Sequence, residues 1–296
     1  MAWMIGGWCK RNGAFLIAST SENDILPIKE LLQGWRPKAS LRSLRSHIWG
    51  RLARGRVRHV VTICEDGRES MRSIGFGDVV TVTPLGFDSA LFYPDASRRA
   101  AIRQALGLTS PVVAYFGRVT QSKGVHILIA ALGHLKDQPW HFLMDDFEHE
   151  STADANWFDR AIDQAGIRDR LITFKATHDG IADYMRAADI VVVPSVWKEQ
   201  YGRVAPEAMA CGCAVVVSNI GALPELVGDA GLTVAPHDID SLSAAIANLL
   251  VNPQRRAALA SRAQVRASGR LSLDRQAALL DSLFRQIAGA GPNRKP

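Results

Sequence analysis

The regular spacing of short apolar runs between residues 112 and 234 constrains the fold of this chain more than any other feature. Six short, mainly apolar runs alternate with helical patterns; they cover residues 112–116, 140–144, 171–174, 190–193, 214–217 and 232–234. Short continuous apolar runs are typical of strands covered on both faces, as in a parallel sheet. Strands that alternate with helices predict an α/β fold with a doubly wound sheet, which binds ligands at the carboxyl ends of its strands.

A polar loop and a short helix lie between the two apolar runs of residues 190–227. The helix is predicted to begin near Pro206, because proline is tolerated in a first turn, and to run to about Cys211. Gly212 then ends it. The unpaired N–H groups at the helix start, reached through a turn at Gly202, can bind an anion such as a diphosphate.

Two glutamates, Glu199 and Glu207, lie on this loop and helix start. A carboxylate accepts two hydrogen bonds readily, so each glutamate can hold two neighbouring sugar hydroxyls. The alternative is that both only cap or solvate the helix start, where acids are favoured in any case.

The order of residues around these glutamates resembles the donor-site motif of retaining glycosyltransferases of family four, which have the GT-B architecture and use nucleotide-sugars. The matching features are Glu199, the aromatic-glycine pair Tyr201-Gly202, Glu207, a helix of small residues ending in Ala-Cys-Gly, a valine strand, and Gly221, Pro224 and Glu225. The resemblance implies that Glu199 contacts the donor sugar and that Glu207 takes the ribose hydroxyls. It also implies that the backbone of Tyr201, Gly202, Arg203 and Val204 contacts the sugar and the diphosphate.

A second group of residues follows the first strand of this sheet. Gly117 and Arg118 come directly after the strand, and Lys123 and Gly124 open the next helix. Two cations at a strand's carboxyl end, beside a helix start, converge where a doubly wound fold binds phosphates. The stretch resembles the family's second motif, in which Arg118 and Lys123 would hold the donor diphosphate. The alternative is an ordinary turn with solvated charges.

Neither a metal nor a cofactor is predicted. When a sugar leaves a diphosphate, negative charge develops on the leaving oxygens, and Arg118 and Lys123 can stabilise that charge. The acidic residues Asp145, Asp146, Glu148 and Glu150 are the one plausible metal cluster, but they follow a middle strand and are interpreted as a solvated loop. Cys211 and Cys213 are interpreted as reduced structural thiols. His126 and His141 lie in patterned elements and are interpreted as packing residues; no general base is predicted.

The chain before residue 93 predicts a second, smaller α/β domain. Strands are predicted at 14–19, 60–63 and 79–83, with a helix at 65–74 between the last two. Proline, glycine and aspartate between Pro84 and Pro94 predict a linker. The predicted domains are residues 1–92, a partial acceptor-side Rossmann-like domain; 93–270, the donor-binding Rossmann-like domain; and 271–296, a helix that packs back across the cleft, with a tail. In the resembling family several strand and helix units precede such a segment, so the first domain is expected to be incomplete.

The net charge of +6 is concentrated early in the chain: eight lysines or arginines lie between Arg36 and Arg58, with no acidic residue from Leu31 to Cys64. This stretch can contact an anionic membrane, or it can be the exposed face of a helix around residues 41–53. Nucleic acid is not expected, because no aromatic array or nucleic-acid motif accompanies the charge. No apolar run approaches the ~20 residues of a membrane helix, so a cytoplasmic protein is predicted, with peripheral contact at the inner membrane face as an option.

Together these features predict a glycosyltransferase that moves a sugar from a nucleotide-diphosphate donor to an acceptor, with retention and without metal. The acceptor, which can be a glycan, a lipid or a small molecule, is not identified by the sequence. Two alternatives remain: a non-catalytic nucleotide-sugar-binding protein or truncated remnant of such an enzyme, and a GT-B sugar-nucleotide epimerase.

Overall fold

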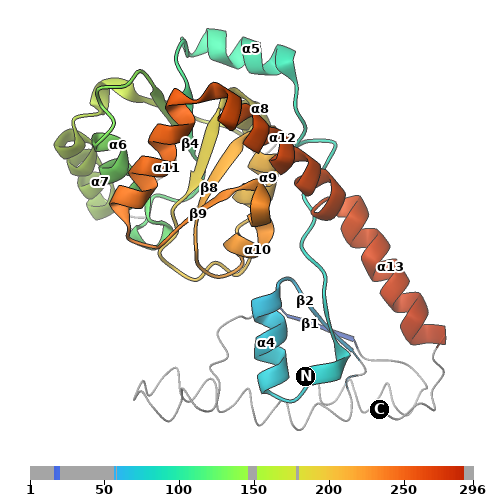
Figure 1. The fold of residues 1–296 in the computed structure, drawn as a ribbon. Helices are drawn as coiled ribbons and strands as arrows, with labels where there is room; N and C mark the ends of the chain where they lie inside the picture. Colours follow the sequence, from blue (N-terminus) through green and yellow to red (C-terminus); the bar gives the residue numbers. More distant parts are fainter. Residues whose placement is uncertain (1–16, 21–56, 58, 146–151, 178–179, 290–296) are drawn as a thin grey trace, which may run out of the picture. The chain divides into compact units, whose positions relative to one another are not determined.

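The computed structural model describes residues 17–20, 57, 59–145, 152–177 and 180–289. The chain divides into two compact units (Figure 1). One contains residues 86–273, and the other combines the described parts of residues 1–85 and 274–296. Both units are built on parallel sheets, which confirms the predicted α/β fold class.

The unit of residues 86–273 contains a six-stranded, wholly parallel sheet with the order β6-β5-β4-β7-β8-β9. Its strands are β4 (Val112–Tyr115), β5 (His141–Asp145), β6 (Leu171–Phe174), β7 (Ile190–Val193), β8 (Ala214–Ser218) and β9 (Leu232–Val234). All six were predicted, to within one residue at each end. The chain starts at β4, moves outward to β6, and returns to β7 on the other side of β4. The sheet therefore reverses its direction of growth between β4 and β7, where doubly wound folds place their ligands.

Helices cover both faces of this sheet (Figure 1). The helices of this unit are α5 (Ala96–Ala105), α6 (Val125–Gly133), α7 (Thr152–Ala165), α8 (Ile181–Ala187), α9 (Val204–Ala210), α10 (Leu223–Val227), α11 (Ile239–Val251) and α12 (Pro253–Arg270), and α5 packs on α8. The main core lies between the sheet and α6, α7 and α11, where alternate strand residues such as Val113, Phe142 and Val192 are buried. On the opposite face α9 packs on β7 and β8, and α12 packs on β8 and α9. Burial on both faces explains why β4 and β7 are apolar along their whole length and why β8 is apolar up to its last residue, Ser218.

The other unit contains a three-stranded parallel sheet with the order β1-β2-β3, formed by Ile17–Thr20, His59–Thr62 and Val80–Val82. Helix α4 (Glu65–Ser73) connects β2 to β3, as predicted, and buries Met71 against Val60 and Phe76. Helix α13 (Leu273–Gly289) contributes Leu283 and Ile287, which pack against Val61 of β2. The predicted helix around residues 41–53 and most of the basic stretch lie outside the described residues.

The two points where the chain passes between the units lie next to each other. Phe87 N–H donates to the Leu271 carbonyl at 2.9 Å, and Leu273 N–H donates to the Phe87 carbonyl at 2.9 Å. A side chain on Gly86 would meet the Leu273 backbone at 2.4 Å, so only glycine allows this approach. Within the described residues, no helix combines the length and apolar character needed to cross a membrane.

Candidate active site

The two predicted groups of site residues meet at the carboxyl ends of β4 and β7. The backbone N–H groups of Val196 and Trp197 both donate to the Ser122 carbonyl, at 3.0 and 3.1 Å, so the loop after β7 is hydrogen-bonded to the loop after β4. Gly124 lies where these loops are closest: its φ is +71°, and a Cβ there would lie 1.8 Å from the Pro194 carbonyl oxygen. The structure thus explains the glycine at the start of α6 by close backbone approach.

Lys123 and Glu199, which lie 76 residues apart in sequence, form an ion pair in this site. The Lys123 Nζ is 2.5 Å from the Glu199 Oε1, and the side chains are 31% and 12% exposed. Ser195 donates its hydroxyl to the same oxygen at 2.7 Å. A cation and a hydroxyl therefore converge on one oxygen of the carboxylate.

The backbone of Glu199 is fixed separately from its side chain. The Ala222 N–H donates to the Glu199 carbonyl at 3.1 Å. Gly221 has a φ of +59°, and a Cβ on it would lie 2.3 Å from that same carbonyl oxygen. The predicted Gly221 of the motif thus brings the start of α10 against the Glu199 backbone.

The loop from Tyr201 to Arg203 leads into α9. Tyr201 is buried, Gly202 has a φ of +79°, and Arg203 is exposed. Glu207 is 8% exposed on the first turns of α9, and its Oε1 lies 3.2 Å from an Arg203 guanidinium nitrogen. The helix begins at Val204, two residues earlier than predicted, because Arg203 already has helical dihedral angles; Pro206 still lies in its first turn.

Arg118 lies exposed on the loop after β4. The buried Tyr115 hydroxyl donates to the Arg118 carbonyl at 2.6 Å and so fixes the turn that contains Gly117. Burial raises the pKa of Tyr115, the nearby Glu199 carboxylate raises this pKa further, and the Arg118 charge partly opposes both effects. Tyr115 therefore stays a neutral hydrogen-bond donor across the physiological pH range.

Two residues of this site, Ser195 and Tyr115, were missed by the sequence analysis. Both lie at or just after the carboxyl end of a strand, the position that already marked Arg118 and Glu199. Their hydroxyls gave no further signal, because serine and tyrosine at strand ends are common and their partners here depend on three-dimensional placement.

The interpretation of the acidic cluster as a loop is wrong for its first member. Asp145 is the last residue of β5 and is buried, whereas Asp146, Glu148 and Glu150 lie outside the described residues. In the described part of the chain, no group of three or more histidine, cysteine or acidic side chains is arranged to hold a metal ion.

The cysteines of this unit are buried thiols, as predicted. The Cys213 Sγ lies 3.1 Å from the Met185 carbonyl oxygen, and the Cys211 Sγ lies 3.8 Å from that of Ala182. Burial raises the pKa of Cys211 to about 12 and raises that of Cys213 well above its ordinary value. Both thiols are therefore protonated and poorly nucleophilic.

His126 packs against a neighbouring ring, as predicted, and His141 is the half-buried first residue of β5. The His126 ring meets the Trp157 ring edge-on, with centroids 6.2 Å apart. Burial lowers the pKa of both histidines, and His126 Nδ1 and His141 Nε2 have no hydrogen-bond partner among the described residues.

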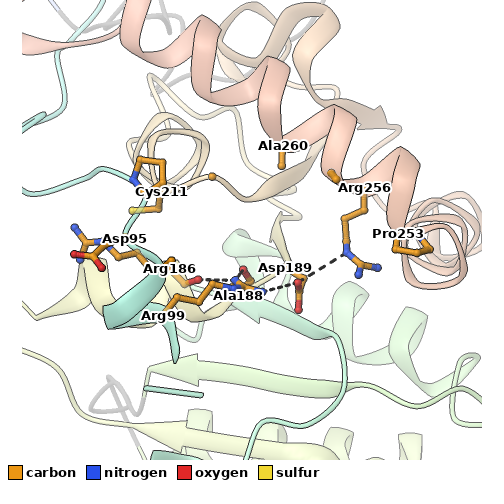
Figure 2. A pocket seen from close by; sticks show the side chains of 13 residues that line it. Asp95, Arg99, Arg186, Ala188, Asp189, Cys211, Pro253, Arg256 and Ala260 are labelled. Carbon is orange, nitrogen blue, oxygen red and sulfur yellow. Dashed lines mark hydrogen bonds and ion pairs between the residues drawn. The ribbon is translucent and has the colours of Figure 1, made fainter. Parts of the chain in front are cut away.

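A cavity of about 490 Å³ lies at the opposite, amino end of the sheet (Figure 2). Its polar wall is organised by Asp189, whose carboxylate accepts hydrogen bonds from Arg99 at 2.7 Å, Arg103 at 3.0 Å and the Val112 N–H at 2.8 Å. Arg99 also donates to the carbonyls of Arg186 and Ala188 at the end of α8. These arginines satisfy buried backbone carbonyls, so we interpret the cluster as structural.

The chain is similar to proteins of known family. The family model for glycosyl transferases group 1 matches residues 98–266, more than half of the chain. A D-inositol 3-phosphate glycosyltransferase of Xylanimonas cellulosilytica is 34% identical over 245 residues, which cover 79% of this chain and 58% of that protein. A protein of the same name from Mycobacteroides abscessus is 31% identical, with 99% of this chain and 67% of that protein covered.

Solved structures agree with these relatives. HepE of Anabaena, solved in complex with UDP, matches with a TM-score of 0.79 and 25% identity, over 96% of this chain and 76% of that one. The chain spans about half to two thirds of the length of its curated relatives. The described site and these similarities together show that the chain belongs to the group 1 family of glycosyl transferases.

Proposed function

We propose that this chain transfers a sugar from a nucleoside-diphosphate donor to an acceptor hydroxyl. The observation that carries the proposal is the Lys123–Glu199 pair at the reversal point of the sheet, with the buried Glu207 eight residues further along the chain on α9. Structures of HepE with UDP and with UDP-glucose support a nucleotide-sugar as the donor.

In this proposal each predicted residue has a definite contact. Glu199 accepts hydrogen bonds from hydroxyls of the donor sugar, and Glu207 accepts them from the ribose. The backbone of Tyr201, Gly202, Arg203 and Val204 lies against the sugar and the diphosphate.

The proposed reaction breaks the bond between the anomeric carbon and the diphosphate oxygen, and the electron pair leaves with the diphosphate. The acceptor oxygen forms the new bond to the anomeric carbon on the same face and passes its proton to the leaving diphosphate oxygen. Arg118 and Lys123 stabilise the charge on the leaving diphosphate. Since these two cations supply that stabilisation, we propose that transfer needs no divalent metal.

The relatives' name makes inositol 3-phosphate the first acceptor to test. Isothermal titration of the full chain with UDP, GDP and ADP, and with UDP-glucose, GDP-mannose and ADP-glucose, identifies the donor. Transfer to inositol 3-phosphate is then measured with and without EDTA, and the anomeric configuration of the product is read by NMR. Activity that is abolished by EDTA and restored by Mn²⁺ would contradict metal independence, and an inverted product would contradict retention.

A second candidate is a protein that binds a nucleotide-sugar without transferring it. The proposed donor contacts all lie between Gly117 and Glu207, within the unit of residues 86–273, so they do not involve the other unit. Donor binding without turnover towards any acceptor would favour this second candidate.

A further inference from the structure

Ser195 lies two residues beyond the end of β7 and is 1% exposed. Its hydroxyl donates to the Glu199 Oε1 at 2.7 Å. A buried hydroxyl that hydrogen-bonds a carboxylate makes a short, directional, charge-assisted bond. Ser195 therefore restrains the orientation of the Glu199 side chain and not only its position.

Lys123 reaches the same oxygen, at 2.5 Å. The other oxygen, Oε2, has no hydrogen-bond partner in the described part of the chain. The backbone of Glu199 is also fixed, by Ala222 and Gly221. The carboxylate therefore has one oxygen, Oε1, that is hydrogen-bonded within the protein, and one oxygen, Oε2, that can accept a hydrogen bond from a ligand.

The ion pair alone would not produce this arrangement. A carboxylate on a glutamate rotates through a broad, two-fold torsional minimum. An ammonium group is a compact charge with three rotatable donors, so it attracts a carboxylate without fixing the plane of its oxygens. In addition, Lys123 is the residue proposed to meet the donor diphosphate, which would compete for its charge. The Ser195 hydroxyl is thus the restraint that remains when a donor binds.

We propose that Ser195 is a positioning residue that commits Oε1 of Glu199 and so presents Oε2 to a hydroxyl of the donor sugar. This inference rests on the proposed function, and it adds a residue that controls which sugar the site accepts. The orientation of Oε2 decides which sugar hydroxyl can donate to it. The hydrogen bond from Ser195 to Glu199 therefore allows the site to distinguish donor sugars that differ at a single stereocentre.

The test compares the sugar's contribution to binding in matched variants of the full chain. Isothermal titration gives the Kd for UDP, UDP-glucose and UDP-galactose, and for GDP and GDP-mannose. The ratio of the diphosphate Kd to the sugar-nucleotide Kd measures the contribution of the sugar alone. Ser195→Ala and Ser195→Cys remove the strong donor, Ser195→Thr keeps a hydroxyl, and Ser218→Ala removes another buried serine hydroxyl, at the carboxyl end of β8.

We expect Ser195→Ala and Ser195→Cys to reduce the sugar contribution about tenfold and to narrow the preference between UDP-glucose and UDP-galactose, because a hydrogen bond to a charged group is lost. The Kd for the free diphosphate should change less than twofold. Ser195→Thr should retain most of the sugar contribution, and Ser218→Ala should match the parent.

Several results would overturn the inference. An unchanged sugar contribution in both Ser195→Ala and Ser195→Cys would show that Ser195 does not position Glu199 for the sugar. Equal weakening of diphosphate and sugar-nucleotide binding would show a general structural role instead. A parent protein that binds none of the diphosphates would refute the proposed function itself, which separates the two failures.

Discussion

Glu207 and Glu199 are held by different kinds of ion pair, although both lie near the start of α9. Glu199 pairs with a partly buried lysine that belongs to another loop. Glu207 pairs with Arg203 on its own helix turn, and Arg203 is 64% exposed. A pair whose cation is this exposed contributes roughly 0–1 kcal/mol, because solvent screens the arginine and its long side chain loses entropy. The Arg203 side chain can therefore leave Glu207 at little cost when a ligand hydroxyl competes for the carboxylate.

Replacing the two members of this pair, one exposed and one buried, should have unequal effects. Glu207→Ala should weaken UDP binding about tenfold or more, because hydrogen bonds between the ribose and a carboxylate are lost. Arg203→Ala should change the Kd less than about threefold, since only a screened contact is removed. Isothermal titration with UDP measures both, and equal losses would mean that Glu207 acts only through its ion pair.

Lys123 should matter more for a diphosphate than for a monophosphate. Lys123→Ala is expected to reduce the preference for UDP over UMP by about 2 kcal/mol, the contribution of a charge-assisted contact to phosphate oxygen. Lys136→Ala provides a control on an exposed lysine beyond the end of α6. Competition titrations with UDP and UMP give the two affinities, and an unchanged ratio would place the diphosphate elsewhere.

At the scale of elements, the approach of the loop after β4 to the loop after β7 depends on Gly124. Gly107 has a similar positive φ, +65°, but a Cβ there would meet nothing within 4 Å. Substituting alanine at Gly107 therefore measures the loss of stability from backbone conformation alone, and substituting it at Gly124 adds the loss from steric overlap.

Gly107→Ala should lower the free energy of unfolding by about 1–2 kcal/mol, the cost of a left-handed conformation with a Cβ. Gly124→Ala should cost roughly a further 2 kcal/mol, because the new methyl group would overlap the Pro194 carbonyl oxygen. Urea unfolding followed by circular dichroism measures both variants. Equal losses would show that the two loops can separate without cost.

The cluster around Asp189 connects α5, the end of α8 and the starts of β4 and β7. Asp189→Ala leaves arginines without their carboxylate, so it should lower the free energy of unfolding by about 3–5 kcal/mol. Asp240→Ala removes a carboxylate that is 93% exposed and should change stability by less than about 0.5 kcal/mol. Thermal and urea unfolding measure both variants. A loss for Asp189→Ala as small as that for Asp240→Ala would show that Asp189 does not stabilise the fold.

The strands could be predicted from sequence because each is a short apolar run with a clear end, and burial on both faces requires that pattern. The contact between Lys123 and Glu199 could be expected only through the motif resemblance, since it depends on β4 and β7 being neighbours. The roles of Ser195 and Tyr115 could not be predicted, because a hydroxyl finds its partner through the final placement of loops. The predicted start of α9 differs from the observed one because Arg203, which makes no side-chain capping hydrogen bond, already adopts helical dihedral angles.

At the scale of the whole molecule, two histidines should make the larger unit sensitive to acid. Burial lowers the pKa of His126, with a smaller contribution from His237, and burial lowers that of His141, with smaller contributions from Arg103 and Arg170. A histidine whose pKa is lower in the folded state than the ordinary 6.5 binds fewer protons folded than unfolded. Stability is therefore complete above about pH 6.5 and is lost as the pH falls from there towards the lowered pKa.

His141→Leu should reduce the loss of unfolding free energy between pH 7 and pH 5. It also removes the buried Nε2, which has no hydrogen-bond partner among the described residues. His134→Leu, at an exposed position after α6, is the matched control for replacing a histidine with leucine at the surface. Urea unfolding at several pH values measures the effect, and parallel curves for His141→Leu and the parent would assign the acid sensitivity to other groups.

The backbone pairing of Phe87 with Leu271 and Leu273 has a consequence for how the chain is assembled. Since the unit of residues 86–273 begins and ends at one place, it has the topology of an insertion: the described parts of residues 1–85 and 274–296 form a single unit, which one continuous segment interrupts. A segment with adjacent ends can be exchanged for a homologous one without changing the separation of the flanking residues. Under the proposed function, the segment of residues 86–273 that holds the nucleotide-sugar can be exchanged as one piece, and donor preference can change by recombination at two neighbouring junctions.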